Sequence, residues 1–130
     1  MAYHFIIIDD NKIDLLVAFK AIEMSHIEHG DIHQFQSGTD ALTFIKTYKP
    51  KQKVIMLVDI QMPVMNGFQF MDEFEALPAK TKKLFHCMFL TSSSNDIDRL
   101  RAQKYPSIKS FLNKPFTSEV VAGIIKNLPA

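Results

Sequence analysis

The sequence has one cysteine, no long hydrophobic run and almost no net charge, and each scarcity excludes a class of protein. Because Cys87 is the sole cysteine, no internal disulfide can form, which is typical of a reducing compartment. No apolar stretch approaches the ~20 residues that a membrane span needs, and no N-terminal secretory signal is visible. A net charge of +1 favours neither nucleic acid nor a membrane surface as partner. We expect a cytoplasmic globular protein.

The chain has 130 residues, of which 47% are hydrophobic, so it is large enough to form one ordinary globular core. Strand-like apolar runs alternate with helix-like segments, which predicts βαβ units and a parallel sheet. Strands are expected over residues 3–8, 32–36, 53–58, 84–90 and 108–112. Helices are expected from about residue 12 to Gly30, from 37 to about 50, and over 68–76, 96–104 and 117–126. No repeat, linker or low-complexity tail interrupts these five units.

Hydrophobic patterning also predicts how some elements are placed. The first helix carries apolar residues on one side, namely Ile13, Leu16, Val17, Ala21 and Met24. The strand over 32–36 alternates apolar and polar residues and is expected near a sheet edge, whereas the strand over 53–58 is the most apolar and is expected at the centre. The basic stretch that contains Lys80, Lys82 and Lys83 is expected to be a solvated loop.

Polar residues follow four of the predicted strands at the points where they end. Asp9 and Asp10 follow the first strand, Asp59 the third, Thr91 the fourth and Lys114 the fifth. In open α/β sheets ligands bind outside the carboxyl ends of the strands. Three carboxylates held close together repel one another unless a cation neutralises them, and hard oxygen ligands suit Mg²⁺.

These residue types also suit chemistry at phosphorus. A carboxylate beside Mg²⁺ can act as a nucleophile and form an aspartyl-phosphate. Lys114 and Thr91 would then contact phosphoryl oxygens. Each residue alone has a simpler explanation, because Asp9, Asp10 or Thr91 could cap the helix that follows it. Their joint occurrence at the ends of four strands is much less expected by chance.

With these residues in place, the sequence resembles the receiver domains of two-component response regulators over essentially its whole length. Asp9-Asp10 resembles the acidic pair of that family, and the segment DIQMPVMNG from Asp59 to Gly67 resembles its phosphoacceptor loop. Thr91 matches the switch hydroxyl, Phe111 the switch aromatic, and Lys114-Pro115 the Lys-Pro pair. The resemblance implies a doubly wound, flavodoxin-like sheet of five parallel strands flanked by five helices.

The resemblance further implies a set of roles. Asp59 would accept a phosphoryl group from a phosphohistidine on a histidine kinase or a phosphotransfer protein. Mg²⁺ would be held by Asp10, Asp59 and the backbone carbonyl of Gln61, with Asp9 acting through a bound water. The Lys114-Pro115 bond would be cis. Such a protein is a phosphoacceptor that assists its own phosphorylation and dephosphorylation, and is not an enzyme in the usual sense.

Phosphorylation would act as a switch. The added charge would draw Thr91 inward and let Phe111 turn inward, which would remodel the face formed by the fourth helix, the last strand and the last helix. Family members usually bind their output partners on that face. Because the chain ends just after the last helix, we expect a stand-alone receiver over residues 1–130 without an output domain, as in chemotaxis regulators. Phosphorylation-linked dimerisation is left open.

Three other functions fit the residues less well. A phosphatase of the haloacid-dehalogenase type would have an aspartate two residues after the nucleophile, where this chain has Gln61. A flavodoxin-like electron carrier would have a phosphate-cradling loop after the first strand. A phosphorylation-independent interaction domain would normally lack one of five key residues, all of which are present here: Asp9, Asp10, Asp59, Thr91 and Lys114. The chain also departs from the family at the last strand, where Tyr105-Pro106-Ser107-Ile108 replaces a common Gly-Ala pair, so the approach to the output face is expected to differ in shape.

Overall fold

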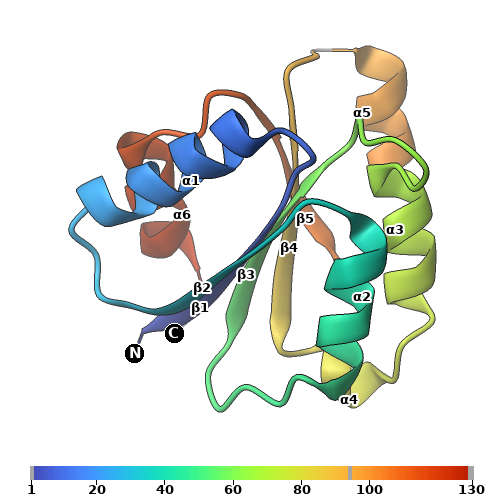
Figure 1. Cartoon of the computed structure of the whole chain (residues 1–130), viewed down its shortest axis with the longest axis horizontal. Helices are drawn as coiled ribbons and strands as arrows, with labels where there is room; N and C mark the ends of the chain where they lie inside the picture. Colours follow the sequence, from blue (N-terminus) through green and yellow to red (C-terminus); the bar gives the residue numbers. More distant parts are fainter. Residues whose placement is uncertain (1, 94, 129–130) are drawn as a thin grey trace.

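Strands and helices alternate along the described part of the chain, except that two helices follow one another between the third and fourth strands (Figure 1). A computed structural model describes residues 2–93 and 95–128. The strands are β1 (Tyr3–Ile8), β2 (His29–Phe35), β3 (Val54–Asp59), β4 (Phe85–Thr91) and β5 (Ile108–Asn113). The helices are α1 (Lys12–Met24), α2 (Gly38–Thr47), α3 (Gly67–Glu75), α4 (Ala79–Lys82), α5 (Asp96–Ala102) and α6 (Ser118–Asn127).

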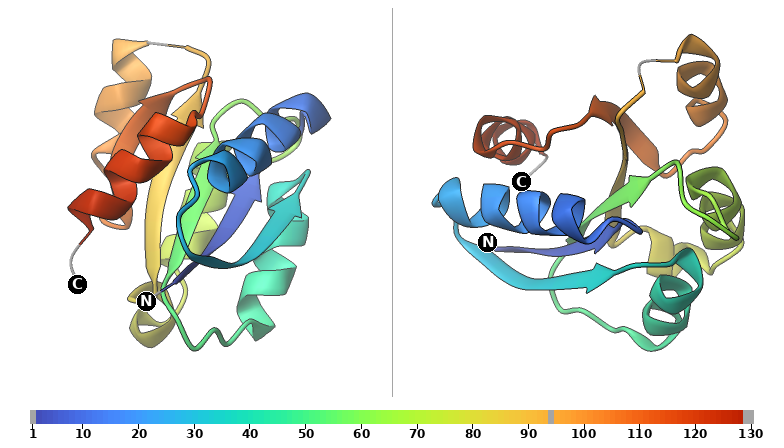
Figure 2. Two further views of the ribbon diagram at one scale, coloured as in Figure 1. Left: turned by 90° about the vertical axis from the view of Figure 1, so that its left-hand side faces the viewer. Right: turned by 45° about the horizontal axis from the view of Figure 1, so that its top comes forward.

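The strands form one parallel sheet in the order β2-β1-β3-β4-β5. As predicted, β3 lies at the centre and β2 at an edge. Helices α1 and α6 cover one face of the sheet, while α2, α3 and α5 cover the other (Figures 1 and 2). This is the doubly wound α/β fold. The chain turns to β2 on one side of β1 and to β3 on the other, so the crevice between the carboxyl ends of β1 and β3 is the switch point where such folds bind ligands.

The core has two layers, one on each face of the sheet. All six residues of β3 are buried, as expected for the central strand of a parallel sheet. The layer beneath α2 and α3 is rich in aromatic rings, contributed by Phe68, Phe70, Phe74, Phe85 and Phe89. The opposite layer is mainly aliphatic and joins β1 and β3 to α1 and α6. Two packed layers hold the ends of the central strands in fixed positions, which a site at the sheet edge requires.

The predicted number of five helices needs one correction. The basic stretch that was expected to be a solvated loop contains a sixth helix, the four-residue α4. Pro78 begins it, and the carbonyl of Pro78 accepts hydrogen bonds from the N–H groups of Thr81 and Lys82. Lys82 also donates a hydrogen bond of 2.8 Å to the carbonyl of Glu75. A single turn of this length has no hydrophobic period, so patterning could not reveal it.

Helix α1 corrects two further predictions. It ends at Met24 and not at Gly30, because the chain leaves the helix through His26, whose φ is 57°, and Gly30 lies inside β2. Of the five residues predicted on the apolar side of the helix, only Ala21 is buried, together with Leu15, Ala18 and Ile22. The other four, Ile13, Leu16, Val17 and Met24, are exposed. None of the helices in residues 2–93 and 95–128 is both long and apolar enough to cross a bilayer.

Candidate functional site

The predicted site residues lie at one edge of the sheet. Asp9 and Asp10 follow β1, Asp59 is the last residue of β3, and Thr91 is the last residue of β4. Lys114 follows β5 directly, and its backbone N–H donates a hydrogen bond of 2.7 Å to the carbonyl of Thr91. These strand ends are therefore neighbours in space, although up to about a hundred residues lie between them in the sequence. The parallel topology requires this, because parallel strands end at the same edge of the sheet.

The N-caps of α1 and α5 are asparagines, so Asp9, Asp10 and Thr91 are not explained as helix caps. Asn11 caps α1, since its side chain accepts hydrogen bonds from the N–H groups of Ile13 and Asp14. Asn95 caps α5 in the same way. Asp9, Asp10 and Thr91 are consequently not needed as caps, although each of them precedes a helix.

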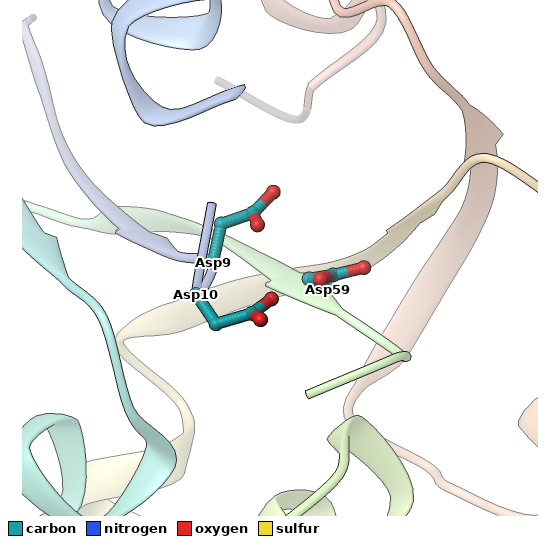
Figure 3. Close-up of side chains that lie close together, drawn as sticks. All are labelled: Asp9, Asp10 and Asp59. Atoms are coloured by element: carbon teal, nitrogen blue, oxygen red, sulfur yellow. The ribbon is translucent and has the colours of Figure 1, made fainter. Parts of the chain in front are cut away.

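The three aspartates form a compact acidic cluster (Figure 3). One carboxylate oxygen from each of Asp9, Asp10 and Asp59 lies within 4.8 Å of the others. Asp9 and Asp59 are only 2% and 5% exposed, whereas Asp10 is exposed. Buried carboxylates of this kind need a positive charge nearby, and the cluster has the ligand type and the spacing to hold a metal ion.

Burial dominates the protonation of Asp59. It raises the pKa of the Asp59 carboxyl to about 7, and the negative charges of Asp9 and, to a smaller extent, Asp10 act in the same direction. The charge of Lys114 and a hydrogen bond from the backbone N–H of Gln61 oppose this rise. A divalent cation in the cluster would lower the pKa again and keep Asp59 ionised at neutral pH.

Lys114 is the positive charge that the structure places against the cluster. Its Nζ lies 2.8 Å from Asp9 Oδ2, 2.8 Å from Asp14 Oδ2 and 3.6 Å from Asp59 Oδ1. Burial lowers the pKa of Lys114, but hydrogen bonds to Asp14 and Asp9 and the charge of Asp59 outweigh it, so the pKa stands above its ordinary value. The Lys114-Pro115 peptide bond is cis, as the family resemblance implied.

Asp14 is a site residue that sequence reasoning missed. It lies in the first turn of α1, where an acidic residue is common for reasons of helix stability alone. One hundred residues separate it from Lys114, with which it forms an ion pair. No local pattern links two such positions, so only the packing of α1 beside the end of β5 could reveal the contact.

The loop after Asp59 is built around a close approach of two backbone segments. The N–H of Gly67 donates a hydrogen bond of 2.9 Å to the carbonyl of Ile60, and a Cβ at residue 67 would lie 2.6 Å from the carbonyl oxygen of Asp59. Only glycine fits there. Asn66 caps α3 in a capping box with Gln69, which fixes the end of the loop.

The two predicted switch residues are placed differently. Thr91 is fully buried, and its hydroxyl accepts a hydrogen bond of 3.1 Å from the N–H of Ser93. Phe111 is partly buried against the aromatic core layer, and the guanidinium of Arg99 lies over its ring, 4.6 Å from the centroid. Arg99 is thus a second residue that the sequence alone did not single out, because the contact joins α5 to β5.

Solved structures share this architecture. A response regulator receiver protein from Dyadobacter fermentans is 25% identical with a TM-score of 0.87, and 96% of each chain is covered. A two-component response regulator from Cytophaga hutchinsonii has a TM-score of 0.84 at 23% identity, and the match covers 96% of this chain and 95% of that one. The fold is therefore that of the receiver domains.

The family follows from the sequence comparison. The family model of the response regulator receiver domain matches residues 5–126, and the chain belongs to this family. Curated relatives are a probable transcriptional regulator, ycf29, of Porphyra purpurea, and probable histidine kinase 6 of Oryza sativa subsp. japonica, each 25% identical. The matches cover 98% and 96% of this chain but 57% and 14% of those proteins, so the chain spans about half or less of their length. Its function is that of a phosphoacceptor in two-component signalling.

Proposed function

We propose that Asp59 is the residue that accepts the phosphoryl group, from a phosphohistidine of a histidine kinase or a phosphotransfer protein. The observation that carries this proposal is the position of Asp59 at the end of the central strand, 5% exposed, between two other carboxylates and a lysine. In the reaction a carboxylate oxygen of Asp59 forms a bond to phosphorus while the bond from phosphorus to the histidine nitrogen breaks. The electron pair of that bond returns to the imidazole, which takes up a proton.

We propose Mg²⁺ as the metal of the acidic cluster, held by Asp10, Asp59 and the backbone carbonyl of Gln61, with Asp9 acting through a water molecule. Oxygen ligands and partial exposure through Asp10 fit a cation that keeps several waters. When bound, the metal would neutralise charge on the phosphoryl oxygens. Lys114 would contact one phosphoryl oxygen and Thr91 another, which would orient the group for in-line transfer and for its later hydrolysis.

The proposed output face consists of α5, β5 and α6. Ile97 and Leu100 on α5 are 73% and 63% exposed, and Phe111 lies beside this helix. A phosphoryl group adds a charge of about −1.5 to −2 and strong acceptor oxygens, which would draw the hydroxyl of Thr91 away from Ser93. The inward turn of Phe111 would then change the surface that a partner protein contacts. This is a shift between two packings of one fold.

We further propose that residues 1–130 work as one receiver unit in the cytoplasm, without nucleic acid or a membrane as partner. Both core layers are built on a single sheet, which supports one cooperative unit. The buried free thiol of Cys87 fits a reducing compartment. Dimerisation linked to phosphorylation would use surfaces outside the acidic cluster.

The experiment that tests this function is intact-protein mass spectrometry after incubation with acetyl phosphate, with and without Mg²⁺. We expect a single phosphoryl adduct that depends on Mg²⁺ and is absent in Asp59→Asn. Asp40→Asn, an exposed acid in the first turn of α2, is the matched control and should be phosphorylated like the wild type. An adduct that persists in Asp59→Asn, or no adduct together with no fluoroberyllate complex, would contradict the proposal.

A further inference from the structure

The ammonium group of Lys114 is shared unequally among three carboxylates. Asp9 Oδ2 and Asp14 Oδ2 both lie 2.8 Å from Nζ, whereas Asp59 Oδ1 lies at 3.6 Å. Charge-assisted hydrogen bonds between nitrogen and oxygen are about 2.7–2.9 Å long, so the first two contacts are hydrogen bonds and the third is an ion pair without a good hydrogen bond. The lysine is therefore held closer to Asp9 and Asp14 than to Asp59.

Asp14 differs from the other two carboxylates in being outside the acidic cluster. It extends from the first turn of α1, its side chain is 35% exposed, and it is not among the three aspartates that lie within 4.8 Å of one another. The α1 cap does not need its carboxylate, since Asn11 is the capping residue. The carboxylate of Asp14 can thus be removed without removing a proposed metal ligand or the helix cap.

An ammonium group has three N–H donors, of which Asp9 and Asp14 occupy two in the resting protein. A phosphoryl group on Asp59, whose Oδ1 lies 3.6 Å from Nζ, would present new acceptor oxygens to the lysine. The third N–H can meet one of these oxygens if Lys114 moves toward Asp59, and that movement would lengthen its contacts with Asp9 and Asp14. The partly exposed contact with Asp14 is the easier one to give up, because water can solvate the released carboxylate.

We propose that Asp14 is a positioning residue that competes with the phosphorylated Asp59 for Lys114 and so weakens binding of the phosphoryl group. This inference rests on the proposed function of Asp59. It means that a residue on α1, outside the phosphoacceptor loop, affects how strongly the phosphorylated state is favoured.

The test measures the affinity of fluoroberyllate, which stands in for the phosphoryl group, in the presence of saturating Mg²⁺. We expect Asp14→Asn to bind fluoroberyllate about 3- to 10-fold more tightly than the wild type, the range of a partly exposed charged hydrogen bond. Asp14→Glu, which keeps the charge, should return the affinity to near the wild-type value. Asp40→Asn, which removes the first-turn acid of α2, controls for the helix-dipole effect and should leave the affinity unchanged.

A double-mutant cycle separates competition for the lysine from simple charge repulsion. If Asp14 acts through Lys114, Asp14→Asn should have no effect on fluoroberyllate affinity when Lys114 is replaced by Met. If the gain in affinity persists in the Lys114→Met background, the effect is direct repulsion and the inference is wrong. The ¹⁵N chemical shift of Lys114 Nζ should also change in Asp14→Asn before any fluoroberyllate is added.

The outcomes distinguish this inference from the proposed function. If the wild type binds fluoroberyllate and Asp14→Asn binds it equally well or more weakly, the positioning role is wrong while the function of Asp59 stands. If the wild type binds no fluoroberyllate and takes no phosphoryl group, the proposed function fails, and the inference about Asp14 falls with it.

Discussion

The carboxyl group of Asp59 is buried beside charges of its own sign, and this makes its ionisation costly in the metal-free protein. Its pKa of about 7 in the folded chain stands well above the ordinary value of 3.8. Between these two values the folded state therefore holds a proton that the unfolded state releases. The stability that this proton contributes is present at low pH and is lost as the pH rises through about 7. The proposed role of Asp59 therefore has a cost in stability.

Asp59→Asn should consequently stabilise the metal-free protein at neutral pH. We expect the variant and the wild type to have similar free energies of unfolding near pH 4. By pH 8 the variant should be more stable by about 1–3 kcal/mol, because its amide carries no charge to bury. Urea denaturation with a chelator present, at several pH values, measures the difference.

The control for this prediction is Asp40→Asn, whose carboxylate is exposed. Its free energy of unfolding relative to the wild type should not follow the same pH dependence. A gap between Asp59→Asn and the wild type that stays constant from pH 4 to pH 8 would show that the ionisation of Asp59 is not the cause.

At the scale of elements, α1 shows how a helix can be apolar on more than one side. Its core face contains Leu15, which is 6% exposed, while the neighbouring Leu16 is 55% exposed. The exposed leucine forms part of an apolar groove between α1 and α6, with a volume of about 420 Å³, that also includes Met24 and Phe116. Periodicity could identify the helix, but it could not decide which apolar side faces the sheet.

Two identical substitutions at neighbouring positions test this orientation. Leu15→Ala should lower the free energy of unfolding by about 2–4 kcal/mol, because it leaves a cavity in the core. Leu16→Ala should lower it by less than about 1 kcal/mol, because the side chain is more than half exposed. Both changes have the same effect on helix propensity, so the difference in urea denaturation reports burial. Equal losses would mean that α1 is rotated relative to the structure.

The segment before β5 is held by polar contacts that the sequence did not predict. Ser107 donates two hydrogen bonds to Glu75, from its N–H at 2.8 Å and from its hydroxyl at 2.7 Å. The hydroxyl of Tyr105 donates one of 2.8 Å to Asp72. Tyr105 and Ser107 thus form polar links between the segment before β5 and α3.

At the scale of the whole molecule, the acidic cluster and the proposed output face are joined through β4 and β5. The backbone N–H of Lys114 bonds to the carbonyl of Thr91, and the side chain of Asn113 donates a hydrogen bond of 3.2 Å to the carbonyl of Ser93. Phe111 lies two residues before Asn113, with its ring beneath the guanidinium of Arg99. A displacement of Thr91 would therefore move the segment after β4 and, through these two hydrogen bonds, the end of β5 that follows Phe111.

The contact with Arg99 should favour the resting position of Phe111. Removing it by Arg99→Ala should shift the population toward the phosphorylated packing, so fluoroberyllate should bind about 2- to 5-fold more tightly, as expected for a cation–π contact of about 0.5–1 kcal/mol. The chain has no tryptophan, so Phe111→Trp introduces a single tryptophan, whose emission can be excited selectively at wavelengths where the three tyrosines absorb little. In that background Arg99→Ala should move the emission part of the way toward its fluoroberyllate-bound value.

Arg101→Ala is the matched control for Arg99→Ala, because its guanidinium lies 4.2 Å from the centroid of another ring, that of Phe68. It should change neither the fluoroberyllate affinity nor the emission of Trp at position 111. If the two arginine variants behave alike, the effect is one of surface charge and not of the contact with Phe111.

The sequence by itself determined the class of the fold and most of the site. Apolar runs that end in Asp9-Asp10, Asp59 and Thr91 predict buried parallel strands, and parallel strands must end at a common edge, so the cluster followed from local pattern and topology together. The segment that resembles the phosphoacceptor loop and the Lys-Pro pair were recognisable because their residues are contiguous. These features depend on short segments, in which each residue constrains its neighbours directly.

Only the tertiary structure decided the rest. Which side of α1 is buried, the pairing of Lys114 with Asp14 and the stacking of Arg99 on Phe111 all depend on how separate elements pack. The same holds for the pKa of Asp59, since its largest cause is burial by the surrounding fold. Packing is decided by the fit of side chains across the whole core, and long-range ion pairs leave no periodic signal in the chain. The sequence thus specifies the residues of the site, while the balance of charge among them is a property of the folded molecule.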